Sequence, residues 1–276
     1  MLDYQAIIKS DTATRLLNVF TFEYSIEEQQ KIVNILYAID EIIAQSESEV
    51  SNLERQKKAA MQKIFSQEVR FKRDDGTAYP DWKEKKIGEV FIRFATGLNP
   101  RDNFILNDSK ASNYYVTIKN FEHGILHLDD NCDFITDEAI QMINKRSNLQ
   151  KDDILLSSIG RIGDCYLIES TPKNWNINEY VFTLRPNQNI LIPLYAFHTI
   201  HSDTVLSYIL KQITGSTFKS IKMAQLKKAP FPIPCLEEQQ KIADFLSDYD
   251  ETISYAKQEL EKWKELKKGL LQQMFI

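Results

Sequence analysis

The chain has 276 residues, of which 43% are hydrophobic and 26% charged, with a formal net charge of −5 at pH 7. This is ordinary for a soluble protein and is enough for one large domain with extensions. There is no apolar run of about 18 residues and no signal peptide at the N-terminus, so we expect a cytoplasmic protein without membrane spans. The cysteines, Cys132, Cys165 and Cys235, lie far apart without a CxxC pair, which argues against a zinc site or a disulfide framework.

The first predicted element is a long helix over residues 26–66, in the stretch that opens SIEEQQKIVNILYAIDEII. Ser25 can cap this helix, and Glu28 can complete a capping box. Seam residues recur at alternate steps of four and three, which is typical of a coiled coil. They are Ile32, Leu36, Ile39, Ile43, Ser46, Val50, Leu53, Lys57, Ala60 and Ile64. Such a long helix cannot bury its seam against itself, so it needs a helical partner.

Residues 67–235 are predicted to form a single α+β domain, because short strands alternate with helices. The expected elements are a turn-rich start and short amphipathic helix (75–91), a strand (113–120) with its hairpin partner (123–128), a helix capped by Thr136 (136–146), two strands joined by a tight turn at Gly160–Gly163 (152–170), a strand (179–186), a helix (193–213), and a loop, short helix and closing strand (214–234).

The last element, residues 236–276, repeats the first helix. With a constant offset of 210, 15 of the 40 positions from Ile26 to Phe65 are identical, which indicates an internal duplication. The heptad seam recurs, and so does its polar interruption, at Lys57 and Lys267. We therefore expect the two helices to pair within the chain; the alternative is two unrelated surface helices. The same offset makes residues 1–25 resemble the end of a first domain whose body is missing.

No catalytic constellation emerges. In PDWKEKK (80–86) the acidic residues are too close together for a metal-dependent nuclease, and GRIG (160–163) lacks the third glycine of a dinucleotide loop. His198 and His201 have no accompanying carboxylate cluster, and no nucleophile elbow is present. We predict a chain without catalytic residues, metal or cofactor.

One segment of the domain is strongly basic. Between residues 203 and 229, Asp203 is the only acid, and the lysines are Lys211, Lys219, Lys222, Lys227 and Lys228. A local basic strip can bind phosphates even on an acidic protein. A solvated helix face is the alternative interpretation.

The long helix with its preceding segment, GSTFKSIKMAQLKKAPFPIPCLEEQQKIADFLSDYDETI (215–253), resembles the specificity subunit of type I restriction–modification enzymes. YPDWKEKKIGEV (79–90) and LQKDDILLSSIGRIGDCYLI (149–168) resemble its target-recognition domain. The resemblance implies a non-catalytic DNA-binding protein whose conserved helices form an antiparallel coiled coil and hold methyltransferase subunits. A nuclease–translocase subunit can join the complex. This chain departs from the pattern, because it has two helices but only one complete domain.

Under this resemblance, the candidate DNA-binding residues lie in loops of the domain. They are Lys119, Asn120, Ser157, Ser158, Arg161, Ser216, Thr217, Lys219 and Lys222. Arg161 could bind a guanine in bidentate fashion and Asn120 an adenine, while lysines contact phosphates. For each, the alternative is an ordinary surface or turn residue. We expect a monomer that associates through methyltransferase partners or weakly with itself; the rival function is a coiled-coil scaffold that binds another protein.

Overall fold

The computed structural model describes residues 25–122, 124–215 and 219–274. The chain divides into two compact units. The coil unit combines residues up to Lys57 with those from Asp248 onward, and the domain unit is Lys58–Ser247. Helix α3 (Ile26–Phe65) and helix α9 (Leu236–Met274) each contribute to both units. In the described part of the chain, neither these helices nor any shorter one has a stretch long and apolar enough to cross a membrane.

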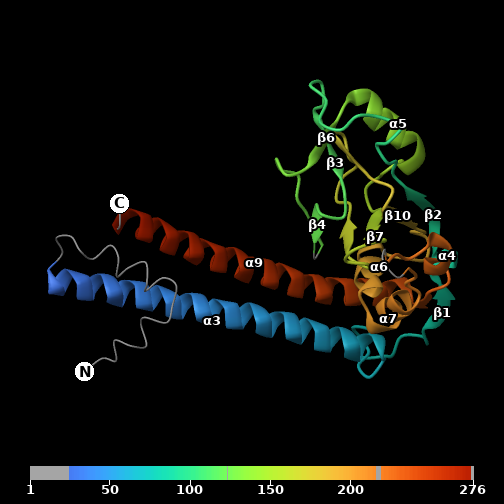
Figure 1. Cartoon of the computed structure of the whole chain (residues 1–276). Coiled ribbons are helices and arrows are strands. Elements are labelled where there is room, and N and C mark those ends of the chain that lie inside the picture. Colours follow the sequence, from blue (N-terminus) through green and yellow to red (C-terminus); the bar gives the residue numbers. More distant parts are fainter. Residues whose placement is uncertain (1–24, 123, 216–218, 275–276) are drawn as a thin grey trace. The chain divides into compact units, whose positions relative to one another are not determined.

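In the coil unit, α3 and α9 run side by side in opposite directions (Figure 1). Four ion pairs join them, and residue numbers rise along α3 as they fall along α9. The pairs are Asp40–Lys267, Glu47–Lys264, Glu54–Lys257 and Lys57–Asp250. Every predicted seam residue of both helices is buried or half-buried. The predicted fold class, an α+β domain flanked by two long helices that pair antiparallel, is confirmed.

The two lysines that interrupt the apolar seam each form an ion pair with an aspartate of the other helix. Lys57 pairs with Asp250, and Lys267 pairs with Asp40 at 2.5 Å. Because Lys57 and Lys267 are equivalent under the 210-residue offset, as are Asp40 and Asp250, the two ion pairs are copies of one contact. The internal duplication is therefore expressed as a local two-fold symmetry of the antiparallel coil.

The domain unit contains a four-stranded antiparallel sheet in the order β2-β10-β7-β8 and a three-stranded mixed sheet in the order β6-β3-β9. Two-stranded pairs β1-β11 and β4-β5 complete the strands that the described residues form. The strand bounds are β1 (Lys83–Lys86), β2 (Phe91–Thr96), β3 (Asn113–Val116), β4 (Phe121–Glu122), β5 (Ile125–Leu126), β6 (Asp133–Ile135), β7 (Ile154–Ser157), β8 (Cys165–Leu167), β9 (Trp175–Ile177), β10 (Val181–Pro186) and β11 (Pro230–Ile233). The short helices are α4 (Ile87–Val90), α5 (Asp137–Ser147), α6 (Pro193–Ile200), α7 (Asp203–Lys211) and α8 (Met223–Leu226).

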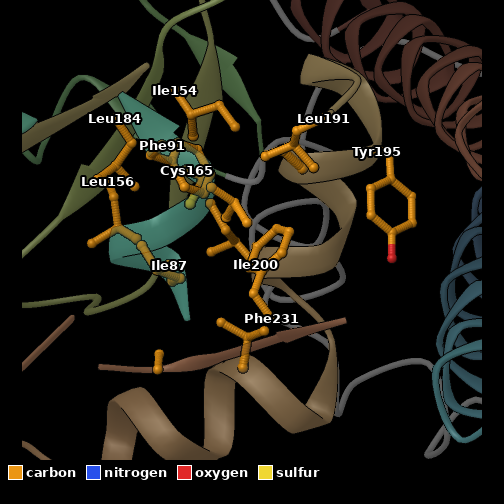
Figure 2. Close-up of a cluster of buried hydrophobic side chains, with 14 of the residues drawn as sticks. Ile87, Phe91, Ile154, Leu156, Cys165, Leu184, Leu191, Tyr195, Ile200 and Phe231 are labelled. Carbon is orange, nitrogen blue, oxygen red and sulfur yellow. The ribbon is translucent and has the colours of Figure 1, made fainter. Parts of the chain in front are cut away.

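The main core lies between the four-stranded sheet and α6. Figure 2 shows Ile154 and Leu156 of β7 and Leu184 of β10 in the same cluster as Leu191 and Tyr195. The ends of α3 and α9 that belong to the domain unit add Ile64, Phe65, Ile242, Ala243 and Leu246 to this cluster. All four residues of β7 are buried, which explains why its first three residues, Ile154, Leu155 and Leu156, are apolar without alternation.

Several predicted elements are confirmed. Thr136 caps α5, because its side-chain oxygen accepts a hydrogen bond from the backbone N–H of Ala139 at 3.3 Å. The strand–turn–strand at 152–170 is the β7–β8 hairpin, and the predicted closing strand is β11. Ser25 and Glu28 form the predicted capping box: the backbone N–H of Ser25 donates to Glu28 at 2.8 Å, and the N–H of Glu28 donates to Ser25 Oγ at 3.3 Å.

Two predictions were wrong in part. β5 forms its hairpin with β4 rather than with β3, which lies between β6 and a parallel β9, although the backbone N–H of His127 still donates to the carbonyl of Asn120 at 2.7 Å. The helix predicted at 193–213 is two helices, because Ser202 leaves the helical conformation and caps α7. The strand pairing of β3 depends on segments that are distant in sequence, whereas the break between α6 and α7 is local, because Ser202 caps α7 through the N–H of Val205. The short amphipathic helix expected within 75–91 is confirmed as α4, in which Ile87 and Val90 are buried and Glu89 is exposed.

The start of α9 also differs from the start of α3. Glu238, the equivalent of Glu28, does not complete a second capping box but is fully buried. Its carboxylate accepts hydrogen bonds from Arg70 at 3.1 and 2.8 Å and from the indole N–H of Trp82 at 2.9 Å. These bonds raise the pKa of the Arg70 guanidinium. The next residue, Gln239, is also fully buried and bonds to the backbone of Ile190 and Ile192. The EEQQ motif thus anchors α9 in the domain unit.

Candidate nucleic-acid interface

Three loops that are far apart in the sequence meet in the domain unit. They are loop A (117–120, between β3 and β4), loop B (158–164, between β7 and β8) and loop C, which here means the described residues 213–215 and 219–222 after α7. Loops B and C are joined by a bridge between Ile159 and Ser220 and by a 3.0 Å hydrogen bond from the N–H of Ile221 to the carbonyl of Ser158. Of the described candidate DNA-binding residues, all but Ser157, the last residue of β7, lie in these three loops.

Arg161 joins loop B to loop A. Its guanidinium donates to the backbone carbonyl of Phe121 at 3.0 Å and to that of Ile118 at 3.4 Å. The same side chain forms an ion pair with Asp164 at 2.7 Å and is 46% exposed. Arg161 therefore organises the loops while one side of it remains open to solvent. The sequence did carry a signal for this ion pair, because Asp164 follows Arg161 by three residues.

Loop B requires glycine where it approaches loop A. Gly160 has a φ of +62°, which side chains rarely adopt. A Cβ atom at this position would also lie 2.8 Å from Cδ1 of Ile118. The glycine thus allows the hairpin to turn and lets the two loops come into contact.

Loops A and C carry exposed lysines. Lys119 of loop A and Lys219 and Lys222 of loop C are exposed. The half-exposed Arg161 is already ion-paired with Asp164, so the exposed lysines supply most of the positive charge of these loops. Lysine and arginine side chains arranged in this way suit the phosphate groups of a nucleic acid.

The other predicted side chains are used inside the domain. Asn120 is 7% exposed; its Oδ1 accepts from the backbone N–H of Thr117 at 2.8 Å, and its Nδ2 lies 3.0 Å from the sulfur of Cys132. Ser157 is 1% exposed and donates to the carbonyl of Ile159, while Ser158 is 4% exposed and donates to the carbonyl of Tyr180. These side chains stabilise the turns, so an adenine contact by Asn120 would require the turn of loop A to open.

The last two candidates, Ser216 and Thr217, lie outside the described residues. Within the described parts of the chain, there is no group of three or more His, Cys, Asp or Glu side chains placed to hold a metal ion.

Burial raises the pKa of the Cys165 thiol well above its usual range and also raises the pKa of the Cys132 thiol. These buried thiols are poorly suited to act as nucleophiles.

Comparison with known proteins identifies the family. Residues 79–265 match the model of the type I restriction modification DNA specificity domain, which is more than half of the chain. The chain belongs to this family. The resemblance seen in the sequence is thereby confirmed.

Curated specificity subunits are similar to this chain over part of their length. The putative type I restriction enzyme MjaX specificity subunit of Methanocaldococcus jannaschii is 26% identical over 259 residues, which cover 89% of this chain and 56% of that protein. The MjaIX specificity subunit of the same organism is 28% identical over 223 residues, covering 77% of this chain and 48% of that one. This specificity-family chain thus spans about half the length of the curated relatives it matches.

Solved structures of the family share the fold. The S subunit of a type I restriction-modification system from M. genitalium superposes with a TM-score of 0.59 at 17% identity, covering 91% of this chain and 62% of that one. The HsdS subunit from Thermoanaerobacter tengcongensis gives a TM-score of 0.54 at 17% identity, covering 98% and 68%. At this identity the likeness is one of fold, with long helices flanking a mixed domain.

Proposed function

We propose that this chain is a DNA-specificity subunit whose domain, residues 67–235, binds one half of a split double-stranded target through loops A, B and C. The observation that carries the proposal is the contact of loop B with loops A and C, together with the exposed lysines of loops A and C. Membership of a family described as a DNA specificity domain supports it.

The exposed lysines and Arg161 are proposed to have different tasks. Lys119, Lys219 and Lys222 would contact phosphates and set the register of the domain on the duplex, which adds affinity for any sequence. Arg161 would read a guanine in the major groove, with its bonds to loop A holding the guanidinium plane in a fixed orientation. A preorganised arginine loses less conformational entropy on binding than a mobile one.

The coil unit is proposed to hold methyltransferase subunits, which the chain would direct to its target, and a nuclease–translocase subunit could join the complex. Support comes from the family and from a structural neighbour described as a type I R-M complex assembly, with a TM-score of 0.52 and 18% identity.

The proposed location is the cytoplasm, where such partners and their DNA would meet. The domain boundaries, including a first-domain remnant in residues 1–25, remain proposals; residues 1–24 lie outside the described part.

Fluorescence anisotropy with duplex DNA tests the proposal. The target is first selected from a random duplex library by the chain together with its cognate methyltransferase subunit. The triple variant K119A/K219A/K222A should weaken binding to target and random duplex alike, and the slope of log K against log salt should fall by about one per lysine. The control is K151A, which removes an exposed lysine outside the three loops.

The arginine is tested separately with R161A and R161K. R161A should reduce the preference for one base pair by about 1–3 kcal/mol, and R161K should retain phosphate affinity but lose the same preference. If the triple lysine variant binds DNA as tightly as the parent, the proposed interface is wrong. If the parent chain binds the methyltransferase subunit but no DNA in its presence or absence, the scaffold alternative replaces the proposal.

A further inference from the structure

The two helices of the coil unit carry opposite charges at two equivalent positions. The 210-residue offset relates Glu47 to Lys257 and Glu54 to Lys264. Each helix thus has a pair of like charges seven residues apart, negative on α3 and positive on α9. Because both helices descend from one repeat, the reversal distinguishes two segments that are otherwise similar.

The reversed positions face each other across the coil. Nζ of Lys264 lies 2.9 Å from Glu47, and Nζ of Lys257 lies 2.6 Å from Glu54. The four side chains are between 41% and 53% exposed, so the pairs flank the seam rather than fill it. The bond to Glu47 raises the pKa of Lys264. Charges beside a coiled-coil seam influence which helices pair.

The other two ion pairs behave differently under the same symmetry. Lys57 and Lys267 are equivalent, as are Asp40 and Asp250, so the pairs Lys57–Asp250 and Asp40–Lys267 are copies of one contact. Each helix carries both members of that contact. These two pairs would form equally in any antiparallel combination of the helices, so they do not distinguish α3 from α9.

We propose that the reversed charges make helix pairing heterotypic: α3 accepts α9, from its own chain or from a second copy, and rejects α3 of a second copy. In an antiparallel α3–α3 pair with the same register, Glu47 would face Glu54 of the second copy, twice over. An α9–α9 pair would likewise set Lys257 against Lys264. Like charges at such positions disfavour the pairing, which is a common way to specify a partner. This inference does not depend on the proposed DNA-binding function.

A cysteine at Val50, the buried seam residue between Glu47 and Glu54, reports on homotypic pairing. Near the centre of an antiparallel α3–α3 pair, this residue would lie close to its counterpart in the second copy and form an interchain disulfide. The full-length chain with V50C and C235S leaves the buried Cys132 and Cys165 as native thiols. It is unfolded in urea, refolded at high concentration in a glutathione redox buffer, and analysed by non-reducing electrophoresis.

The decisive variant adds E54K/K264E to this background. Within one chain of this variant, Glu47 faces the new carboxylate at position 264, so two negative charges meet. Lys257 faces the new ammonium group at position 54, so two positive charges meet. Each homotypic pair, in contrast, becomes attractive. We expect the cross-linked fraction to rise about tenfold or more over the V50C/C235S parent, and the difference to shrink in 1 M salt, where surface charges are screened. The net charge of the chain is unchanged.

Two controls separate selection from loss of stability. The full reversal E47K/E54K/K257E/K264E restores opposite charges across the coil and should cross-link no more than the parent. D40N/D250N weakens the contacts that every helix combination shares and should not raise cross-linking either. Equal cross-linking in the parent and the E54K/K264E variant, whether low or high, would overturn the proposal, and so would cross-linking by either control at the level of that variant.

Discussion

Removal of the Glu238 carboxylate should destabilise the domain unit. The carboxylate is fully buried and accepts three hydrogen bonds, two from Arg70 and one from Trp82. Breaking a buried ion pair by removing one partner typically costs about 3–5 kcal/mol. The Arg70 side chain is 23% exposed and also donates to the carbonyl of Pro80 at 2.7 Å, so part of its charge remains solvated. We therefore expect the low end for E238A, about 3 kcal/mol, and about 1–2 kcal/mol for E238Q, which keeps an acceptor for Trp82.

Urea unfolding followed by tryptophan fluorescence measures this effect. A W263F background removes the tryptophan of the coil unit, so the signal comes from Trp82 and Trp175 of the domain unit. In a thermal melt, a loss of about 3 kcal/mol should lower the midpoint by roughly 6–12 °C for a domain of this size.

The duplication supplies the matched control for this experiment. Glu28 occupies the equivalent position in α3, but it is exposed and bonds to Ser25. E28Q should therefore leave the unfolding of the domain unit unchanged. If E238A and E238Q unfold at the same urea concentration as E28Q, the buried anchor does not stabilise the domain and the reasoning is refuted.

Three further perturbations test other parts of the fold. L36D places a carboxylate at a seam position that is 6% exposed, so it should lower the free energy of unfolding by several kcal/mol and open the coil. Faster hydrogen exchange of the α3 amides would detect the opening. The control is Y37D, which changes the exposed neighbouring residue and should not open the coil. D153A leaves Arg185 without its 2.7 Å partner in the core and should lower the free energy of unfolding by about 3–5 kcal/mol; a loss no greater than that of a typical surface substitution would contradict this. G160A should disturb the contact between loops A and B, and it should lower DNA affinity by more than it lowers the free energy of unfolding. An unchanged DNA affinity would show that this loop contact is not needed for DNA recognition.

The local elements of the structure followed from the sequence. Heptad spacing, the capping residues Ser25 and Thr136, and the strand–turn–strand around Gly160 all depend on interactions between residues close in the chain, so their patterns are visible without the fold. The offset of 210 residues also identified the partner of each long helix, because a repeated seam needs a complementary surface. The contacts of loop B with loops A and C were not visible in this way, because they join segments that are far apart in the sequence.

The tertiary structure decided which side chains point inward and which strands pair. Asn120, Ser157 and Ser158 have the composition of DNA-contacting residues, yet packing turns them toward backbone groups that would otherwise be unsatisfied. Glu28 and Glu238 show the same effect of tertiary packing, because both stand in the sequence EEQQKI. Glu28 is exposed, whereas Glu238 is buried against Arg70 and Trp82. Sequence determines what a helix can present along its surface, whereas burial of a given side chain depends on residues more than a hundred positions away that only the fold brings into contact with it.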